Sequence, residues 1–251
     1  MMRFLVFHLH GPFASWGDIA VGEVRPSFEA PTRSALLGLI SGALGISREA
    51  QKEAVTLKDF LRFAVRVERQ GHFMEEYQTI SFPEGRGHDK ARTRKQELVF
   101  SQDNTMQSYR EHYMDAVYTI FLTTHNNAKS DLLEDIEHAL RHPHYVPFLG
   151  RKACPLDIPM LPRIISAPTL QAALASKEAE IPASISSILF PNATAQPSQR
   201  RRLVIADAAF DTWSWLTEET RTNEPGSRTS WHFSKNRVRI GFDVELPNEE
   251  N

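Results

Sequence analysis

Stacking faces and positive charges gather in the segment from Tyr145 to Cys154, which reads YVPFLGRKAC. Two aromatic residues precede a glycine and two adjacent cations, and the candidate binding residues are Tyr145, Phe148, Gly150, Arg151 and Lys152. Aromatic rings stack on unpaired bases, and Lys and Arg neutralise phosphates, so this combination favours a loop that binds single-stranded RNA. The alternative is a solvated turn, because short loops of this composition are common.

A second group of positive charges lies between Glu84 and Lys95, where cations outnumber carboxylates. The cations are Arg86, Lys90, Arg92, Arg94 and Lys95. The surrounding stretch, residues 82–105, is polar and almost without apolar residues, a composition that cannot build its own core. We therefore expect it to protrude as a hairpin or flexible arm. The alternative is a solvated loop without a binding role.

Histidine is the other residue type that could do chemistry, and the chain has ten. Residues eligible for general acid and base catalysis of RNA cleavage are His8, His10, His112 and Tyr113. None has a spacing that identifies a site, and a buried, hydrogen-bonded histidine is the simpler interpretation. His138, His142 and His144 are spaced so that they could bind a metal, but no Cys or carboxylate completes a known ligand pattern. The sequence thus predicts no metal site and no cofactor.

Composition sets the broad class of protein. The 251 residues include 29 Lys and Arg against 31 Asp and Glu, a formal net charge of −2, so any nucleic-acid site must be a local patch. The single cysteine, Cys154, excludes a secreted disulfide scaffold and a multi-cysteine zinc site. No apolar run reaches the roughly 18 residues of a membrane span or forms a signal peptide. We expect a soluble, cytoplasmic protein with no membrane partner.

The elements that must position these residues follow from apolar periodicity and capping signals. Strands are expected at residues 3–9, 63–68, 73–80 and 113–122, and helices at 33–44, 47–58 and 131–142. Thr32 and Gly45 suit the two ends of the helix at 33–44, and Ser130 suits the start of the last one. This order predicts an α+β fold with helices on one face of an antiparallel sheet and the other face open. Ferredoxin-like folds are the natural candidates.

The rest of the chain looks like a connector followed by more strands. Nine of the 15 prolines lie between Pro143 and Pro197, which favours extended or looped structure with one short helix at residues 170–175. Strand signals return at residues 203–205, 230–233 and 238–244. We expect these strands to complete the β-structure of the first domain.

Four motifs, in order over about the first 160 residues, resemble those of a known family. They are GPFASWG at residues 11–17, PTRSALLGLI at 31–40 continuing to GALG at 42–45, SYREHY at 108–113 followed by Asp115-Ala, and PFLGRKACPL at 147–156. The chain resembles the CasD family, the type I-E CRISPR Cascade subunits that cap the 5′ handle of the guide RNA (crRNA). From Arg163 onward the resemblance is loose.

The resemblance implies an RRM-like domain of the RAMP superfamily. Residues 1–160 would form this domain, with a basic β-hairpin thumb inserted at about residues 82–105. Residues 161–251 would form the Pro-rich connector and a small C-terminal β-rich extension packed on the first domain. The implied partners are crRNA, the Cascade filament (backbone) subunit, the large target-reading subunit and, through the complex, target DNA.

The motifs carry RNA-binding roles onto particular residues. From the resemblance, the candidate RNA-binding residues are Trp16, Arg33, Tyr109, Arg110, Tyr145, Phe148, Gly150, Arg151 and Lys152, with Lys90, Arg92, Arg94 and Lys95 in the thumb. Phe148 stands where the family has a tyrosine, and His112 displaces the last aromatic of the Arg110 motif. Arg33 could instead be a cation at the helix start that a core carboxylate holds, and Trp16 could be a core residue.

Two functions from different classes follow. The first is a non-catalytic subunit that binds the 5′ handle of crRNA, caps the filament end and so supports recognition of target DNA. The second is a metal-independent endoribonuclease that processes CRISPR repeat RNA, since relatives of this family in another CRISPR subtype do so.

Overall fold

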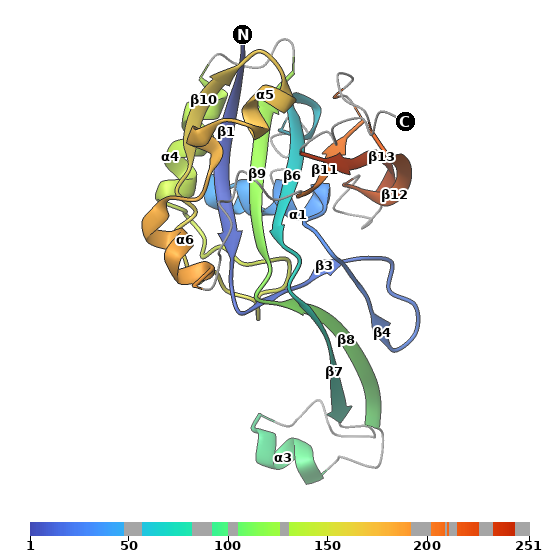
Figure 1. The fold of residues 1–251 in the computed structure, drawn as a ribbon. Helices are drawn as coiled ribbons and strands as arrows, with labels where there is room; N and C mark the ends of the chain where they lie inside the picture. The colour runs from blue at the N-terminus through green and yellow to red at the C-terminus, as the bar shows by residue number, and fades with distance from the viewer. Residues whose placement is uncertain are drawn as a thin grey trace.

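The computed structural model describes residues 1–47, 57–81, 92–99, 105–125, 131–191, 202–208, 210, 215–225 and 233–243. Its main feature is a seven-stranded antiparallel sheet in the order β10-β1-β9-β6-β11-β13-β12 (Figure 1). The strands are β1 (Met2–His10), β6 (Leu61–Arg69), β9 (Val117–Thr124), β10 (Arg163–Ala167), β11 (Leu203–Asp207), β12 (Thr217–Pro225) and β13 (Phe233–Phe242). The fold is mixed α and β, with antiparallel sheets and few helices.

Most predicted elements of the first half are confirmed. Strand β1 matches residues 3–9, β6 matches 63–68, and β7 (His72–Ser81) matches 73–80. Helix α1 (Arg33–Ala43) begins after Thr32, whose Oγ1 accepts a hydrogen bond from the amide of Ala35. It is followed by Gly45, which has a φ of +74° that favours glycine. Residues 48–56 of the predicted helix at 47–58 lie outside the described residues.

One sequence prediction of this part needs correction, and one strand was missed. The run at 113–122 is not one strand, because Asp115, with a φ of 56°, turns the chain between β8 (Thr105–Met114) and β9. The polar strand β8 itself was not predicted over most of its length. Helix α4 (Leu132–Arg141) is close to its predicted position, with Asp131 as its N-cap; Ser130 lies outside the described residues.

The second half is more regular than its prolines indicate. The predicted helix at 170–175 is confirmed as α5 (Leu170–Leu174), and the strand at 203–205 as β11. Strand β10, helix α6 (Ala183–Leu189), a short 3-10 helix (Lys177–Ala179) and β12 were missed. Strand β13 begins at Phe233 and ends at Phe242, so it is longer than the predicted strand at 238–244 and ends earlier; residues 226–232 and 244–251 lie outside the described residues.

The sheet is covered on both faces, which corrects the expectation of one open face. Alternate residues of β1 point to opposite sides, as the period of a strand requires. Leu5 and Phe7 join a core with α1 and α4, whereas Phe4 and Val6 join a second core with α5. The first core is the larger one. An RNA site on this fold must therefore lie at its edges or on its extensions.

A buried ionic cluster connects the late segments to the sheet. Arg66 is fully buried on β6 and contacts Glu68 at 2.7 Å, while its guanidinium donates to the carbonyl of Leu174 in α5. Arg202, just before β11, contacts Glu68 and Glu180 at 3.0 Å each. Buried charges are tolerated when each is paired and hydrogen-bonded, as here.

His8 lies beside this cluster and makes the stability of the fold depend on pH. The side chain is fully buried, with Nδ1 3.1 Å from Thr119 Oγ1 and Nε2 3.3 Å from Arg163 Nη2. Burial, and next the charge of Arg163, lower the pKa of His8 to about 4. Native His8 is therefore neutral at pH values where the unfolded chain binds a proton.

We predict that stability falls as the pH decreases from about 6.5 to about 4. Above this range His8 is neutral in both the native and the unfolded chain. Within it only the unfolded chain binds a proton at His8, which lowers the free energy of unfolding by up to about 3 kcal/mol. Urea unfolding at several pH values checks this, with His8→Gln as the comparison. The free energy of unfolding of His8→Gln should depend less steeply on pH than that of the unchanged chain. An equally steep dependence would contradict the assignment of this pH effect to His8.

Candidate nucleic-acid interface

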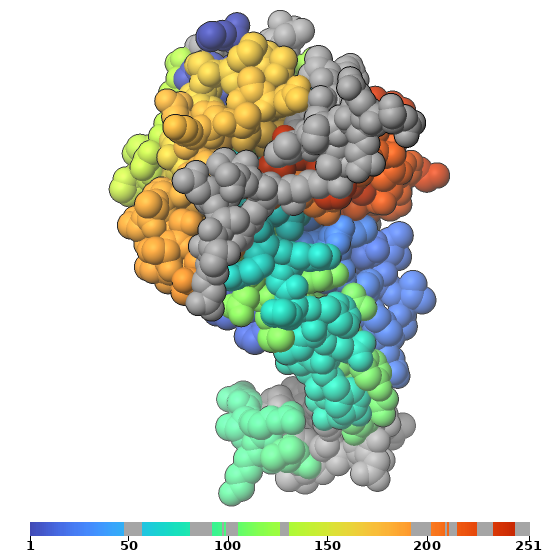
Figure 2. Space-filling view, in the orientation of Figure 1, coloured from blue at the N-terminus to red at the C-terminus, as the bar shows by residue number. Residues whose placement is uncertain are grey.

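A long hairpin leaves the sheet at the end of β6. Strands β7 and β8 pair in register from His72 opposite Met114 to Ser81 opposite Thr105. Figures 1 and 2 show this hairpin standing clear of the body, with α3 (Arg94–Val99) at its far end. We call β7, β8 and α3 the arm. Its position brackets the predicted protrusion at 82–105, of which residues 82–91 and 100–104 lie outside the described residues.

The two sides of the arm differ in chemistry because side chains alternate along each strand. On one side Arg110 lies opposite Glu76, and His112 lies opposite Met74. On the other side aromatic rings pair across the strands: Tyr77 with Tyr109 at 5.2 Å between centroids, and Phe73 with Tyr113 at 5.9 Å. One side of the arm therefore carries charged and polar groups, including Arg110, and the other side carries paired aromatic rings.

Arg151 joins the predicted binding loop to the base of the arm. Its Nη2 donates to the carbonyl of Arg25 at 2.9 Å, and its Nη1 lies 3.4 Å from both the carbonyl of Glu111 and Nε2 of His112. Strand β4 (Val24–Arg25) pairs in parallel with β8 and places Arg25 beside Arg110. Three arginines from three separate segments thus lie near one another, and, after burial, the charges of Arg110 and Arg25 both help to lower the pKa of Arg151.

Gly150 makes this arrangement possible. Its φ of +83° favours glycine, and a Cβ built there would lie 1.9 Å from the carbonyl oxygen of Ser15. Ser15 also donates from its hydroxyl to the carbonyl of Glu111 and from its amide to the carbonyl of Leu149. The role of Gly150 is therefore to allow this close approach of two loops.

The electrostatics of the junction favour an anion. Burial, and next the positive charge of Arg110, lower the pKa of Arg151. Burial and then Arg151 lower the pKa of His112, which keeps its ring neutral. The two nearby carboxylates are already engaged: Oε2 of Glu111 accepts from the amide of Ser27 at 2.9 Å, and Glu76 accepts from Gln78 and lies 3.3 Å from Nε2 of His112. Positive charges this close together gain from a phosphate that lies between them.

Arg25 is the residue that the sequence analysis missed. It lies outside the two basic clusters, and only its parallel pairing with Arg110 brings it to the site. Its Nη1 donates to the carbonyls of Gly22 and Val24, so its side chain turns back along its own loop. Nothing in the local sequence marks it, because the signal is a pairing between distant segments.

The other predicted binding residues differ in how exposed they are. Tyr145 is 51% exposed and Phe148 41% exposed, so both rings have a free face, and Lys152 is also exposed. Tyr109 is half-buried on the aromatic side of the arm. Arg92, Arg94 and Lys95 are exposed at the far end of the arm, whereas Lys90 lies outside the described residues.

Trp16 and Arg33 are corrected to structural residues. Trp16, in β3 (Trp16–Gly17), is 1% exposed, and its Nε1 donates to Tyr118 Oη at 3.2 Å, so it has no face for a base. Arg33 is 8% exposed, and its guanidinium contacts Asp207 at 2.5 Å and Glu224 at 2.6 Å. Both match the structural alternatives that their sequence contexts allowed.

The candidate catalytic histidines are also buried. His8 and His10 point into the fold, and His10 is 2.9 Å from the carbonyl of Ala116. His112 is 5% exposed and lies 3.3 Å from Oε2 of Glu76. In the part of the chain described, no group of three or more His, Cys, Asp or Glu is placed to hold a metal, and no helix is long and apolar enough to cross a membrane.

Solved structures with this fold come from CRISPR systems. A chain from a CRISPR RNA-guided surveillance complex has a TM-score of 0.62 at 23% identity, with 95% of this chain and 89% of that chain covered. A crystal structure of a Cas protein has a TM-score of 0.56 at 21% identity, with 95% and 94% covered. The fold is therefore that of CRISPR-associated proteins.

Sequence similarity narrows this class to one family. The family model for CRISPR-associated protein (Cas_Cas5) matches residues 4–239. The CRISPR system Cascade subunit CasD of Escherichia coli (strain K12) is 32% identical over 181 residues, which are 71% of this chain and 78% of that protein. The chain belongs to the CRISPR-associated Cas5 family, and the resemblance to CasD proteins is confirmed.

We predict that Trp16→Phe lowers stability and spares RNA binding. The variant loses the Nε1 hydrogen bond to Tyr118 and leaves a gap beside a buried ring, which should cost about 1–3 kcal/mol. Chemical denaturation and the affinity for single-stranded RNA are measured together. Unchanged stability with weaker RNA binding would instead make Trp16 a stacking platform.

Proposed function

We propose that this chain is a non-catalytic subunit of a Cascade-type CRISPR surveillance complex that binds the 5′ handle of crRNA and caps the filament end. One observation carries the proposal: Arg25, Arg110 and Arg151 lie near one another at the base of the arm, next to the loop that holds the exposed rings of Tyr145 and Phe148. Membership of the Cas5 family and the similarity to CasD support it.

The energetics of this junction suit a single strand. Stacking of a base on an aromatic ring contributes about 1–3 kcal/mol, and each phosphate contact adds a salt-dependent term. A few such contacts make a tight site on a protein with a net charge of −2. The aromatic rings would hold bases, and the arginines would hold the backbone that joins them.

We further infer that the first half of the chain is an RRM-like domain and that the arm is its thumb. Strands β10, β1, β9 and β6 are neighbours in that order, with α1 between β1 and β6 and α4 between β9 and β10 in sequence. This is the βαββαβ connectivity of ferredoxin-like folds, with the arm inserted between the second and third strands. Since β10 begins at Arg163, the domain so defined would extend past residue 160, and the predicted division of the chain at that residue stays a prediction.

The proposed partners follow from the same assignment. The thumb would lie across crRNA where handle meets spacer and contact the first filament subunit. The large target-reading subunit and target DNA would meet this chain within the complex, in the cytoplasm. The aromatic side of the arm and its exposed basic end provide the contacts for this role.

We predict that Arg110→Gln, Arg151→Gln and Lys152→Gln together weaken handle binding by on the order of tenfold or more, because charge-assisted contacts to phosphate are lost. The slope of log affinity against log salt should fall by roughly 0.7 for each lost contact. Titrations of a labelled handle RNA at several salt concentrations measure both quantities.

The matched control removes three exposed cations far from the arm: Arg3→Gln, Lys177→Gln and Lys235→Gln. It should keep the affinity and slope of the unchanged chain. Equal slopes for both triple variants would assign Arg110, Arg151 and Lys152 a structural role. A denaturing gel of the same mixtures with repeat RNA separates binding from cleavage, and cut RNA would overturn the non-catalytic assignment.

The thumb role gives a prediction about assembly. Replacing Lys90, Arg92, Arg94 and Lys95 with Ala should leave the melting temperature nearly unchanged, because the three described residues among them are exposed. Recovery of the complete complex should fall, since the ordered thumb depends on contacts with RNA and the filament subunit. Co-purification of the variant with crRNA and filament subunits measures this recovery. Recovery equal to that of the unchanged chain would contradict the thumb role.

A further inference from the structure

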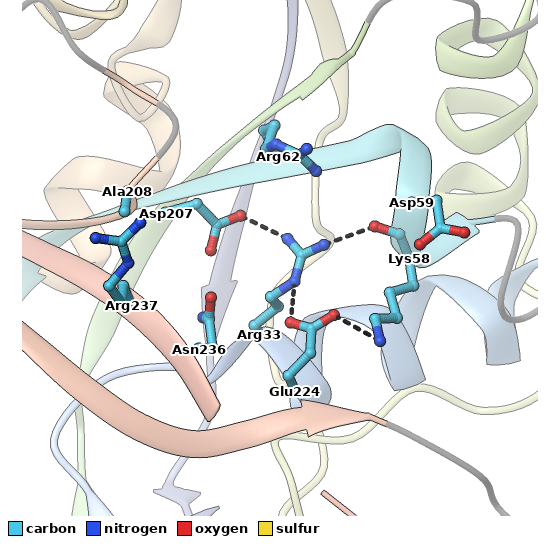
Figure 3. Close-up of a pocket in the computed structure, with 9 residues that line it drawn as sticks. All are labelled: Arg33, Lys58, Asp59, Arg62, Asp207, Ala208, Glu224, Asn236 and Arg237. Carbon is cyan, nitrogen blue, oxygen red and sulfur yellow. Dashed lines mark hydrogen bonds and ion pairs between the residues drawn. The ribbon is translucent and has the colours of Figure 1, made fainter. Parts of the chain in front are cut away.

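A polar pocket of about 350 Å³ opens at the end of β6 that is farthest from the arm (Figure 3). It is lined by residues of α1, β6, β11, β12 and β13 and by the turn before β6. Arg62 of the pocket lies seven residues before the end of β6 at Arg69, and the arm begins at His72, so at about 3.3 Å per residue roughly 23 Å of strand separates the pocket from the arm. This pocket is therefore distinct from the junction at the arm.

The buried acids of the pocket are already neutralised. Arg33 contacts Asp207 at 2.5 Å and Glu224 at 2.6 Å, and Lys58 contacts the second oxygen of Glu224 at 3.4 Å. Figure 3 shows this chain of contacts across the floor of the pocket. Asp207 also accepts from the amide of Phe63. These four side chains form a closed set with little charge left for a ligand.

Two further guanidinium groups line the pocket without a strong acidic partner. Among the described residues, Arg62 donates only to the carbonyl of Leu61, at 3.0 Å. Arg237 contacts Glu218 at 3.3 Å, but its side chain is 69% exposed, and such exposed pairs contribute little. The remaining acid of the lining, Asp59, is exposed. The unmatched charge of the pocket is therefore positive.

We infer that this pocket binds a phosphate group, held by Arg62 and Arg237. A planar guanidinium group donates two parallel hydrogen bonds to two oxygens of one phosphate, whereas a lysine ammonium acts as a point charge without this geometry. The volume lies within the range of about 300–1,000 Å³ that small-molecule sites occupy. The phosphate comes either from the backbone of a nucleic-acid strand or from a free nucleotide. Arg33 organises the site and does not itself bind the ligand.

The test titrates the full chain with two probes, AMP and a ten-residue oligouridylate without a terminal phosphate. All proteins carry Arg110→Gln and Arg151→Gln, so that binding at the arm does not mask the pocket. Adding Arg62→Gln and Arg237→Gln should weaken binding by on the order of tenfold. For the oligonucleotide the salt slope should fall by roughly 0.7 per lost contact.

Lys235→Gln is the matched control, because it removes an exposed charge from the same strand outside the pocket lining and should leave binding unchanged. Arg62→Lys with Arg237→Lys keeps the charge and should restore only part of the affinity. If the double Gln variant loses AMP binding, the ligand of the pocket is a free nucleotide. If it loses only oligonucleotide binding, the ligand is the backbone of a nucleic-acid strand. Failure of both probes to bind, or binding that the double Gln variant retains within twofold, overturns the inference whatever the outcome at the arm.

Discussion

The close contact between the loops at Ser15 and Gly150 is the constraint on which the candidate RNA site depends. Gly150 has a φ of +83° and leaves no room for a Cβ against the carbonyl of Ser15. This approach lets Ser15 and Arg151 both reach the carbonyl of Glu111 on β8. The arm pairs with the body through two short strands on β8, namely β2 (Phe13–Ala14) and β4, so its direction is set where it joins the body. The same contact thus fixes the loop, the arm and the arginines between them.

Arginine has three different roles in this fold, and its partners decide which one applies. Arg33 and Arg66 are buried with carboxylates and hold segments together. Arg151 donates mainly to backbone carbonyls, which orient it but leave its charge unbalanced. Arg110 makes no hydrogen bond from its side chain to another described residue and is half-buried beside Glu76. Arg110 and Arg151 form no salt bridge with a carboxylate of the described residues, so their guanidinium groups remain for phosphate.

Sequence reasoning located elements with strong periodicity or caps, and it failed where long-range pairing decides the structure. Helix α1 carries its own signals in Thr32 and Gly45, so its limits could be predicted. Strand β8 is polar along most of its length, and only pairing with β7 makes it a strand. The family resemblance suggested Trp16 and Arg33 as binding residues, but their burial follows from contacts with Tyr118 and with Asp207, about 100 and 170 residues away. Arg25 was missed for the same reason.

The most direct test of the RNA site is a site-specific cross-link from Phe148. A photoreactive phenylalanine derivative at this exposed position replaces one ring with another, and primer extension on the cross-linked crRNA identifies the nucleotide that it contacts. The account predicts cross-links confined to the 5′ handle in the assembled complex, and none from the same substitution at buried Phe121. Cross-links confined to the spacer, or to protein alone, would contradict it.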